Sequence, residues 1–320
     1  MGKVDSFQII LEKPSGIFTS GEMVQGKLVV SIRERLKINK LELILEGNGM
    51  VIWTEPSASF SNCAREEYAH RNWVFLAKDP NNDCYLEVGE QSFQFQFQLP
   101  QNLPPNFEHD NARVEYFLRG DIDIPWAFDK TVYLSFTVTS HFDLNTNPKL
   151  REPKMRENTE LIGYYCCKAD SFILKLSISK TGFVSGEMLS FKAILDNKCS
   201  ISMRYVSFKV IQLIECNVRG KSRTFSRSVI ELACPKKIKA RMSEEWNDSV
   251  IIPPICPSSN GSRSTIMKIR YGAELFVDPS ESEFDIYVII PIVIGTVPIS
   301  GGAPIKATKA NALPIIKKNK

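Results

Sequence analysis

Two runs of basic residues in the second half of the chain carry side chains that could bind anions. The first run surrounds an expected hairpin turn at Gly220 and the second follows Pro235; together they comprise Arg219, Lys221, Arg223, Arg227, Lys236, Lys237, Lys239 and Arg241. Guanidinium groups bind phosphate and carboxylate in a bidentate way, and lysine adds a point charge. These residues are therefore candidates for binding anionic lipid or phosphorylated tails, the alternative being ordinary solvated loop charge.

The residue types needed for catalysis do not converge in any recognisable motif. The three histidines, His70, His109 and His141, lie outside zinc-protease and nucleophile patterns, and we expect His109 on a surface loop. Gly-Lys-Ser at 220–222 resembles the end of a phosphate-binding loop, but Glu215 stands where that loop needs glycine. We therefore expect no catalytic residues, no metal site and no cofactor.

The eight cysteines contain no Cys-x-x-Cys pair. Cys166 and Cys167 are adjacent, and neighbouring residues rarely supply two of the four ligands that zinc requires. Free thiols are the expectation, and a redox-responsive site is the alternative.

Charge and hydropathy restrict the location and the partners of the protein. Residues 1–160 carry 17 Lys and Arg against 23 Asp and Glu, whereas residues 161–320 carry 23 against 13. The basic half favours acidic partners. Because no aromatic residues interleave with the basic runs, we expect no nucleic acid among those partners. The start lacks a secretory pattern, and the apolar run 286–299 is short and contains two prolines. We expect a cytoplasmic protein.

Strand signals dominate the chain. Residues 92–99 alternate strictly, placing Phe93, Phe95, Phe97 and Leu99 on one face and the glutamines on the other. Similar alternation marks further segments at 41–46, 132–138, 172–178 and 205–210. The best candidate for a short helix is 62–70. Many short strands separated by turns predict an all-β protein made of antiparallel sandwiches.

An internal repeat indicates two related domains. Ser-Gly-Glu-Met occurs at 20–23 and again at 185–188, and a Pro-Pro pair precedes a strand tyrosine in each half, at Tyr116 and Tyr271. A period this long indicates a duplicated domain rather than a solenoid. We place a first sandwich at 5–145, a linker at 146–164, a second sandwich at 165–300 and a disordered basic tail at 301–320.

These motifs, in this order, resemble the α-arrestins (arrestin domain-containing proteins). The resemblance covers about residues 5–300 and rests on short segments spread along the chain: 18–27, 99–105 with Tyr116, 143–148, 182–187 and the closing segment 291–298. It implies the arrestin fold, two tandem immunoglobulin-like β-sandwiches in a curved body.

The same resemblance implies a non-enzymatic adaptor for cytoplasmic tails of membrane proteins, acting in endocytosis and protein transport at the plasma membrane and endosomes. Many α-arrestins recruit HECT-type ubiquitin ligases through Pro-Pro-x-Tyr. Here the two Pro-Pro pairs, at 104–105 and 253–254, lack that tyrosine, which leaves ligase recruitment an open question. One alternative is a sandwich sensor that holds a lipid or small ligand between its domains. Another is a redox-responsive arrestin of the thioredoxin-interacting type, and an enzyme is the least favoured reading.

Overall fold

The first half of the chain folds into an antiparallel β-sandwich. The computed structural model describes residues 3–56, 60–162, 170–259, 261, 263–279 and 285–300. The strands of the first half are β1 (Val4–Leu11), β2 (Ile17–Thr19), β3 (Met23–Ile32), β4 (Leu36–Ile38), β5 (Lys40–Thr54), β6 (Ser61–Ala77), β7 (Cys84–Leu86), β8 (Gly89–Gln98), β9 (Phe107–His109), β10 (Ala112–Asp123) and β11 (Lys130–Thr139). A sheet of order β1-β3-β8 packs on one of order β2-β11-β10-β5-β6, with β9 added to β10.

The second half repeats this topology after two short 3-10 helices. Its elements are η1 (Leu144–Thr146), η2 (Pro148–Arg151), β12 (Lys154–Ile162), β13 (Asp170–Ile178), β14 (Gly182–Val184), β15 (Met188–Asn197), β16 (Met203–Val218), β17 (Lys221–Ala233), β18 (Ser243–Ile251), β19 (Met267–Pro279) and β20 (Ile286–Gly295). The order β14-β20-β19-β16-β17 matches β2-β11-β10-β5-β6, and β13-β15-β18 matches β1-β3-β8. The predicted all-β tandem sandwich is confirmed.

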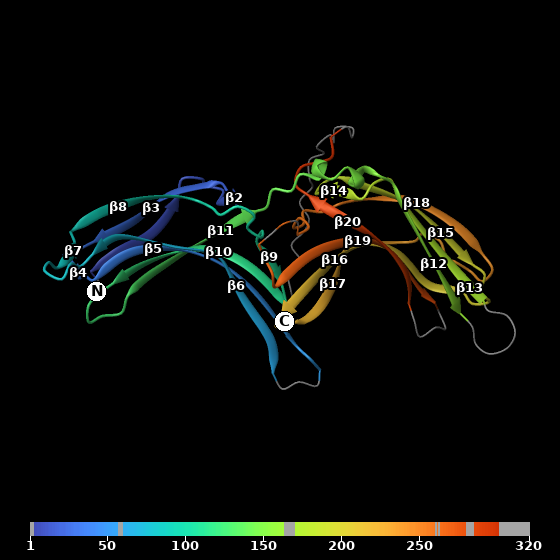
Figure 1. Cartoon of the computed structure of the whole chain (residues 1–320), viewed down its shortest axis with the longest axis horizontal. Helices are drawn as coiled ribbons and strands as arrows, with labels where there is room; N and C mark the ends of the chain where they lie inside the picture. Colours follow the sequence, from blue (N-terminus) through green and yellow to red (C-terminus); the bar gives the residue numbers. More distant parts are fainter. Residues whose placement is uncertain are drawn as a thin grey trace.

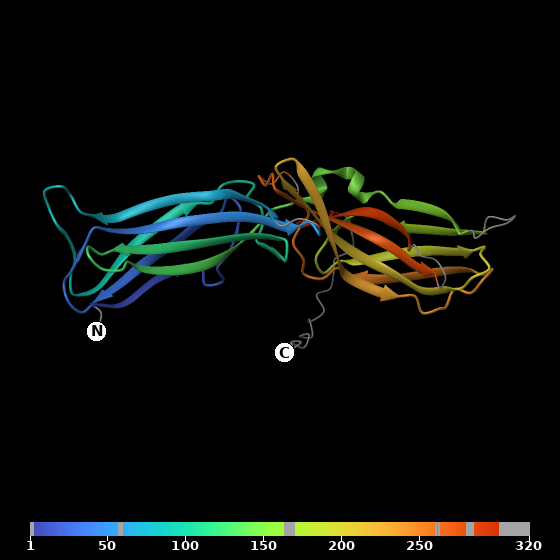
Figure 2. The same ribbon diagram turned by 90° about the horizontal axis from the view of Figure 1, so that it is seen from below.

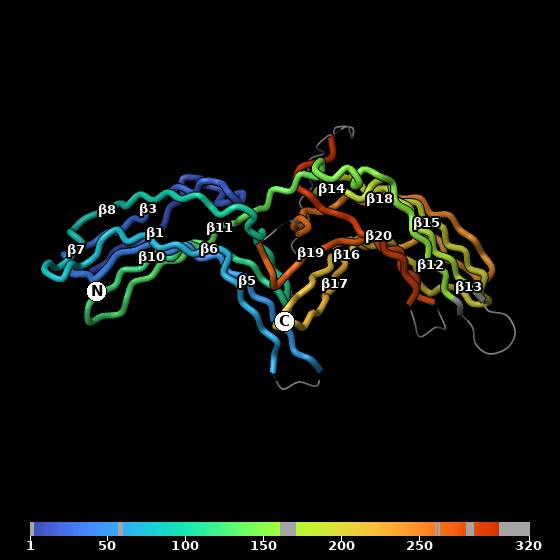
Figure 3. Tube along the Cα trace, in the orientation of Figure 1, coloured from blue at the N-terminus to red at the C-terminus, as the bar shows by residue number. Residues whose placement is uncertain are grey.

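The two sandwiches lie end to end and form an arch (Figure 1). Seen from below, their strands run roughly along the long axis of the molecule (Figure 2). The sheet containing β5, β6 and β10 and the sheet containing β16, β17 and β19 lie on the inner side of the arch, as the Cα trace in Figure 3 shows. In the part of the chain that the structure describes, no helix is long and apolar enough to cross a membrane.

The Ser-Gly-Glu repeat builds the same turn in both halves. Gly21 and Gly186 each have φ of 85°, a left-handed conformation that favours glycine. The following carboxylate closes the turn: Glu22 accepts a hydrogen bond from the Thr19 amide at 2.7 Å, and Glu187 accepts one from the Val184 amide at 3.0 Å. The Lys13 ammonium, 2.6 Å from Glu22, and the Thr19 amide hold the pKa of Glu22 below its usual value.

The turn precedes or follows strands of a parallel pairing in each sandwich. β2 pairs in parallel with β11, and β14 pairs in parallel with β20. Lys13 lies over the Phe18 ring at 5.0 Å, and its counterpart Lys180 lies over Phe183 at 5.2 Å. The Ser-Gly-Glu repeat in the sequence therefore corresponds to the same turn, with the same contacts, in both sandwiches.

The repeated tyrosines anchor the segment that precedes them. Tyr116 and Tyr271 are each 1% exposed, and their hydroxyls donate to the carbonyl oxygens of Pro104 at 2.7 Å and Cys256 at 2.5 Å. The Tyr271 hydroxyl also accepts from the Nε2 of Gln212, a fully buried side chain, at 2.6 Å. Buried polar groups need such partners, so these bonds fix the path of each loop.

Two segments differ from the prediction. Residues 62–70, expected as a helix, lie in β6 and pair along β5, with a register shift at Gly47/Asn48 that buries both Tyr68 and Ala69. That shift and the charged residues around it hide the alternation of the strand. Residues 154–162, expected in the linker, form β12 and pair with β13 at every residue. β12 is an edge strand with mostly exposed side chains, so its sequence is polar.

We predict that Tyr271→Phe destabilises the fold more than Tyr116→Phe. Loss of the Tyr271 hydroxyl leaves buried Gln212 without a partner for its amide, at a cost of about 1–3 kcal/mol in the free energy of unfolding, whereas loss of the Tyr116 hydroxyl costs about 1 kcal/mol. Urea denaturation followed by circular dichroism measures both. Tyr133→Phe, at an exposed site, is the control. Equal midpoints for Tyr271→Phe and Tyr133→Phe would contradict the prediction.

Candidate functional site

One carboxylate accepts several hydrogen bonds across the seam between the sandwiches. Glu66 on β6 accepts hydrogen bonds from the amide of Thr265 at 2.9 Å and from its hydroxyl at 2.9 Å. The Ser264 hydroxyl donates to the same carboxylate at 3.3 Å and accepts from the Tyr68 hydroxyl at 2.8 Å. Burial raises the pKa of Tyr68, which therefore remains a hydrogen-bond donor. We call Glu66, Tyr68, Ser264 and Thr265 the seam latch.

A ring cluster lies beside the latch and joins three strands. Phe225 of β17 lies 6.5 Å from Trp53 of β5 and 5.9 Å from His109 of β9, measured between ring centroids. Arg223 covers the other side of the Phe225 ring at 5.3 Å and forms an ion pair with Glu55 at 3.6 Å. Hydrophobic, cation–π and ionic contacts therefore all cross the seam at this point.

The end of the first sandwich is also bound to the last strand of the second. The Phe142 amide donates to the Thr296 hydroxyl at 2.7 Å, and the Thr296 amide donates back to the Phe142 carbonyl at 2.9 Å. Asn145 donates to the Pro298 carbonyl at 2.9 Å and accepts from the Ser300 amide at 2.8 Å. Two separate regions, the latch and this linker contact, therefore constrain the angle between the sandwiches.

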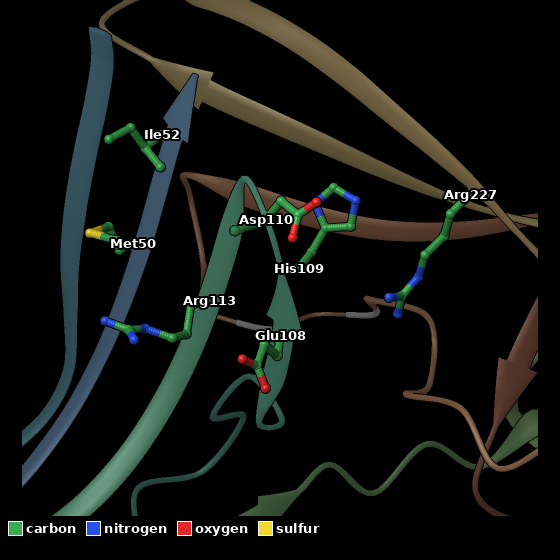
Figure 4. Close-up of a pocket in the computed structure, with 8 residues that line it drawn as sticks. Met50, Ile52, Glu108, His109, Asp110, Arg113 and Arg227 are labelled. Atoms are coloured by element: carbon green, nitrogen blue, oxygen red, sulfur yellow. The ribbon is translucent and has the colours of Figure 1, made fainter. Parts of the chain in front are cut away.

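A cavity of about 690 Å³ opens at the seam. It is lined by Met50, Ile52, Glu108, His109, Asp110, Ala112, Arg113 and Arg227. Figure 4 shows Glu108, His109 and Asp110 between the two arginines, with Met50 and Ile52 on neighbouring β5. The lining has carboxylates and guanidinium groups but no serine, cysteine, threonine or lysine. It can bind a polar or zwitterionic group.

His109 belongs to this cavity and not to a surface loop, so the expectation for it is wrong. It ends β9, is half-buried, and its Nδ1 accepts a hydrogen bond from the Asn111 amide at 3.1 Å. Burial lowers the pKa of His109, and the charge of Arg227 lowers it further. The imidazole is therefore neutral near pH 7, with its Nε2 carrying the proton.

The structure places Arg219, Lys221 and Arg223 at the start of β17, Arg227 at its middle and the other four predicted basic residues beyond its end. Arg219 occupies the β16–β17 turn with φ of 48°, Lys221 follows it, and Arg223 and Arg227 reach the seam. The remaining four, from Lys236 to Arg241, follow the far end of a 13-residue strand, about 40 Å away. The sequence therefore groups side chains that the fold separates.

Several of these basic side chains have structural partners. The Arg227 Nε donates to Gln212 Oε1 at 2.6 Å, and its guanidinium lies 5.8 Å from the centre of the Phe107 ring. Lys236 forms an ion pair with Glu244, and Arg241 donates to the Lys198 carbonyl.

Sequence reasoning missed the seam latch entirely. Glu66 and Tyr68 lay in the segment expected as a helix, and Ser264 and Thr265 lay in an unremarkable polar loop. Among the residues that the structure describes, no group of three or more His, Cys, Asp or Glu is arranged to hold a metal ion. Cys166 and Cys167 lie outside the described residues.

Comparisons with known proteins match both halves. The family described as "Arrestin (or S-antigen), N-terminal domain" matches residues 7–145, and "Arrestin (or S-antigen), C-terminal domain" matches residues 168–299. Similar proteins include arrestin domain-containing protein 17 of Caenorhabditis elegans, 27% identical over 93% of this chain and 72% of that protein. Arrestin domain-containing protein 4 of Mus musculus is 26% identical over 94% of this chain and 74% of its own length. Arrestin domain-containing protein 5 of Bos taurus is 25% identical over 98% of both chains.

We predict that Glu66→Gln loosens the seam. The glutamine amide has one accepting oxygen where the carboxylate has two, so its NH2 group would face the Thr265 amide, which is itself a donor, at a cost of about 1–3 kcal/mol. Hydrogen exchange measured by mass spectrometry should then be faster in residues 263–267. Glu67→Gln is the matched control, because the Glu67 side chain is 64% exposed and lies 3.8 Å from His70. Unchanged exchange in Glu66→Gln would show that the latch does not hold the seam.

We also predict a pH dependence that arises from His109. Its pKa is lower in the folded protein, so the unfolded chain binds this proton first as the pH falls. The stabilisation is full above about pH 6.5 and is lost as the pH falls through the folded pKa. The melting temperature of the wild type should therefore fall more between pH 7 and pH 5 than that of His109→Gln. Parallel pH profiles would refute this assignment.

Proposed function

The chain belongs to the arrestin family, among its arrestin domain-containing members, and on that premise we propose that it is a non-enzymatic adaptor for cytoplasmic regions of membrane proteins. The family supports an adaptor role. We extend the proposal to endocytosis and protein transport, with the protein in the cytoplasm and peripheral to the plasma membrane and endosomes. A HECT-type ubiquitin ligase is a candidate partner, recruited without a Pro-Pro-x-Tyr motif in this sequence.

The observation that carries this proposal is an apolar groove in the second sandwich. It lies on the face of the β14-β20-β19-β16-β17 sheet that points away from the core of that sandwich. The groove has a volume of about 510 Å³ and lies where β16, β19 and β20 meet the linker helices. Its apolar lining includes Leu213, Ile289 and Val293, which alternate with core residues along their strands, so their side chains are not needed inside the sandwich. Arg270 and Glu215, 3.2 Å apart, supply charge at the same groove.

This combination suits an extended tail segment. Apolar side chains of a tail would enter the groove, and polar groups of the same tail would bind the Arg270–Glu215 pair. Phe142, which is hydrogen-bonded to Thr296, lines the groove, so the groove lies beside the linker that joins the two sandwiches. The fixed arch then offers a bound tail surfaces from both sandwiches.

The basic residues of β17 are proposed as two separate sites for anions. Arg219 and Lys221 at the turn lie near the seam, and Lys237 and Lys239 lie at the far end of the strand. Phosphorylated tails and an anionic membrane surface are the two targets that their charge favours.

The seam cavity favours a second candidate function, the binding of a small ligand between the sandwiches. Its volume of about 690 Å³ falls in the range of ligand sites. A redox-responsive role has less support, because burial raises the pKa of Cys216 to about 11 and of Cys256 to about 12 and so keeps these thiols protonated. A thermal-shift screen that finds a stabilising ligand without tail binding would favour the sensor.

We predict that Leu213→Asp weakens tail binding about tenfold or more, because a buried apolar contact is replaced by a carboxylate that must lose its water. The measurement is fluorescence anisotropy with a panel of labelled cytoplasmic tails of membrane proteins. Val88→Asp, at an exposed apolar site in the first sandwich, is the control. In the same assay, Lys221→Glu should weaken the binding of phosphorylated tails selectively. The proposal fails if no tail binds, or if Leu213→Asp and Val88→Asp behave alike.

A further inference from the structure

The turn between β10 and β11 carries two aromatic side chains that none of the described residues covers. Trp126 is fully exposed and Phe128 is 96% exposed; the next most exposed large apolar side chain among the described residues is Phe60, at 66%. Residues 124–129, which we call the aromatic turn, lie at the outer tip of the first sandwich. The turn projects to the same side of the arch as the β5–β6 hairpin (Figure 1). A monomeric globular fold gains nothing from such exposure.

The backbone holds both rings outward. Trp126 has φ of 62°, a left-handed conformation that is uncommon for a bulky residue. The Ala127 amide donates to the Ile124 carbonyl at 3.3 Å, and the Ile124 amide donates to the Asp129 carboxylate at 3.3 Å. Pro125 restricts the backbone further. The rings are therefore presented by a closed turn, and binding through them costs little conformational entropy.

The surroundings of the turn are apolar and cationic. A cavity of about 560 Å³ beneath the rings is lined by Val4, Leu36, Ile124 and neighbouring turn residues together with Lys3, Lys37 and Lys130. No carboxylate belongs to that lining. Lys37 is paired with Asp83 at 2.6 Å and Lys3 lies 3.8 Å from Glu34, whereas Lys130 makes no ion pair with any residue that the structure describes.

We propose that the aromatic turn binds the surface of an anionic lipid bilayer. The indole of Trp126 and the ring of Phe128 enter the interfacial region, and the ammonium groups of Lys130 and Lys3 contact anionic headgroups. Indole rings favour the level of the headgroups, and weak insertion combined with basic residues gives reversible membrane binding. A lipid bilayer can deform around two rings that project from a convex tip, whereas a protein partner would need a groove already shaped to fit them.

This inference goes beyond the adaptor role, because it gives the first sandwich a membrane contact separate from the basic residues of β17. It also fixes an orientation: the inner side of the arch, toward which the turn projects, would face the membrane from which cytoplasmic tails emerge.

Co-sedimentation of the full chain with phosphatidylcholine vesicles, with and without phosphatidylserine, tests the proposal. Binding should require phosphatidylserine, and Trp126→Ala/Phe128→Ala should lower the partition coefficient about tenfold or more. Lys130→Glu should weaken binding only to the anionic vesicles. Tyr287→Ala, which removes an exposed ring from the second sandwich, is the matched control and should bind as the wild type does.

Tryptophan fluorescence with brominated lipids reports insertion directly. Trp53 and Trp246 are buried and Trp73 is partly buried, so most of the quenching should come from Trp126 and be lost in Trp126→Ala. Three outcomes overturn the proposal: equal partitioning of the double variant and the wild type, quenching that survives Trp126→Ala, or self-association without lipid that the double variant abolishes. None of these readouts involves a tail peptide, so failure here is distinct from failure of the adaptor proposal.

Discussion

The shape of the molecule depends on the hydrogen bonds that the Glu66 carboxylate accepts. Its partners lie about two hundred residues away in the chain, on the loop that leads into β19. A carboxylate that loses water must regain hydrogen bonds, and here the second sandwich supplies them. The ring cluster around Phe225 and the seam cavity lie at the same seam.

The duplication of one domain explains why the two sandwiches share their internal anchors. Each sandwich uses the same glycine-carboxylate turn and the same buried tyrosine hydroxyl to fix its loops. The tyrosine of the second copy has one more partner, Gln212, which in turn accepts a hydrogen bond from Arg227 at the seam. Internal packing of the second sandwich is thereby linked to the surface that faces the first, and the copies have diverged at their contact.

The sequence predicted the fold class and the repeat because both depend on local patterns, such as the alternation of Phe95 and Phe97 in β8. It did not predict the seam latch, because a register shift in β6 interrupts the alternation near Glu66, and pairing with Thr265 depends on tertiary structure. It also grouped basic residues that β17 holds apart. Exposure of an aromatic ring such as Trp126 depends on what packs above it, which no local pattern records.

An adaptor that presents surfaces from two domains to one partner needs a fixed angle between those domains. The latch and the linker contact at Phe142 provide two constraints on that angle, and the groove lies beside the second of them. Small-angle X-ray scattering of the full chain in solution tests this claim most directly. The account predicts a profile that a single arched conformation of the two sandwiches fits. A profile that requires an ensemble of widely different hinge angles would contradict it.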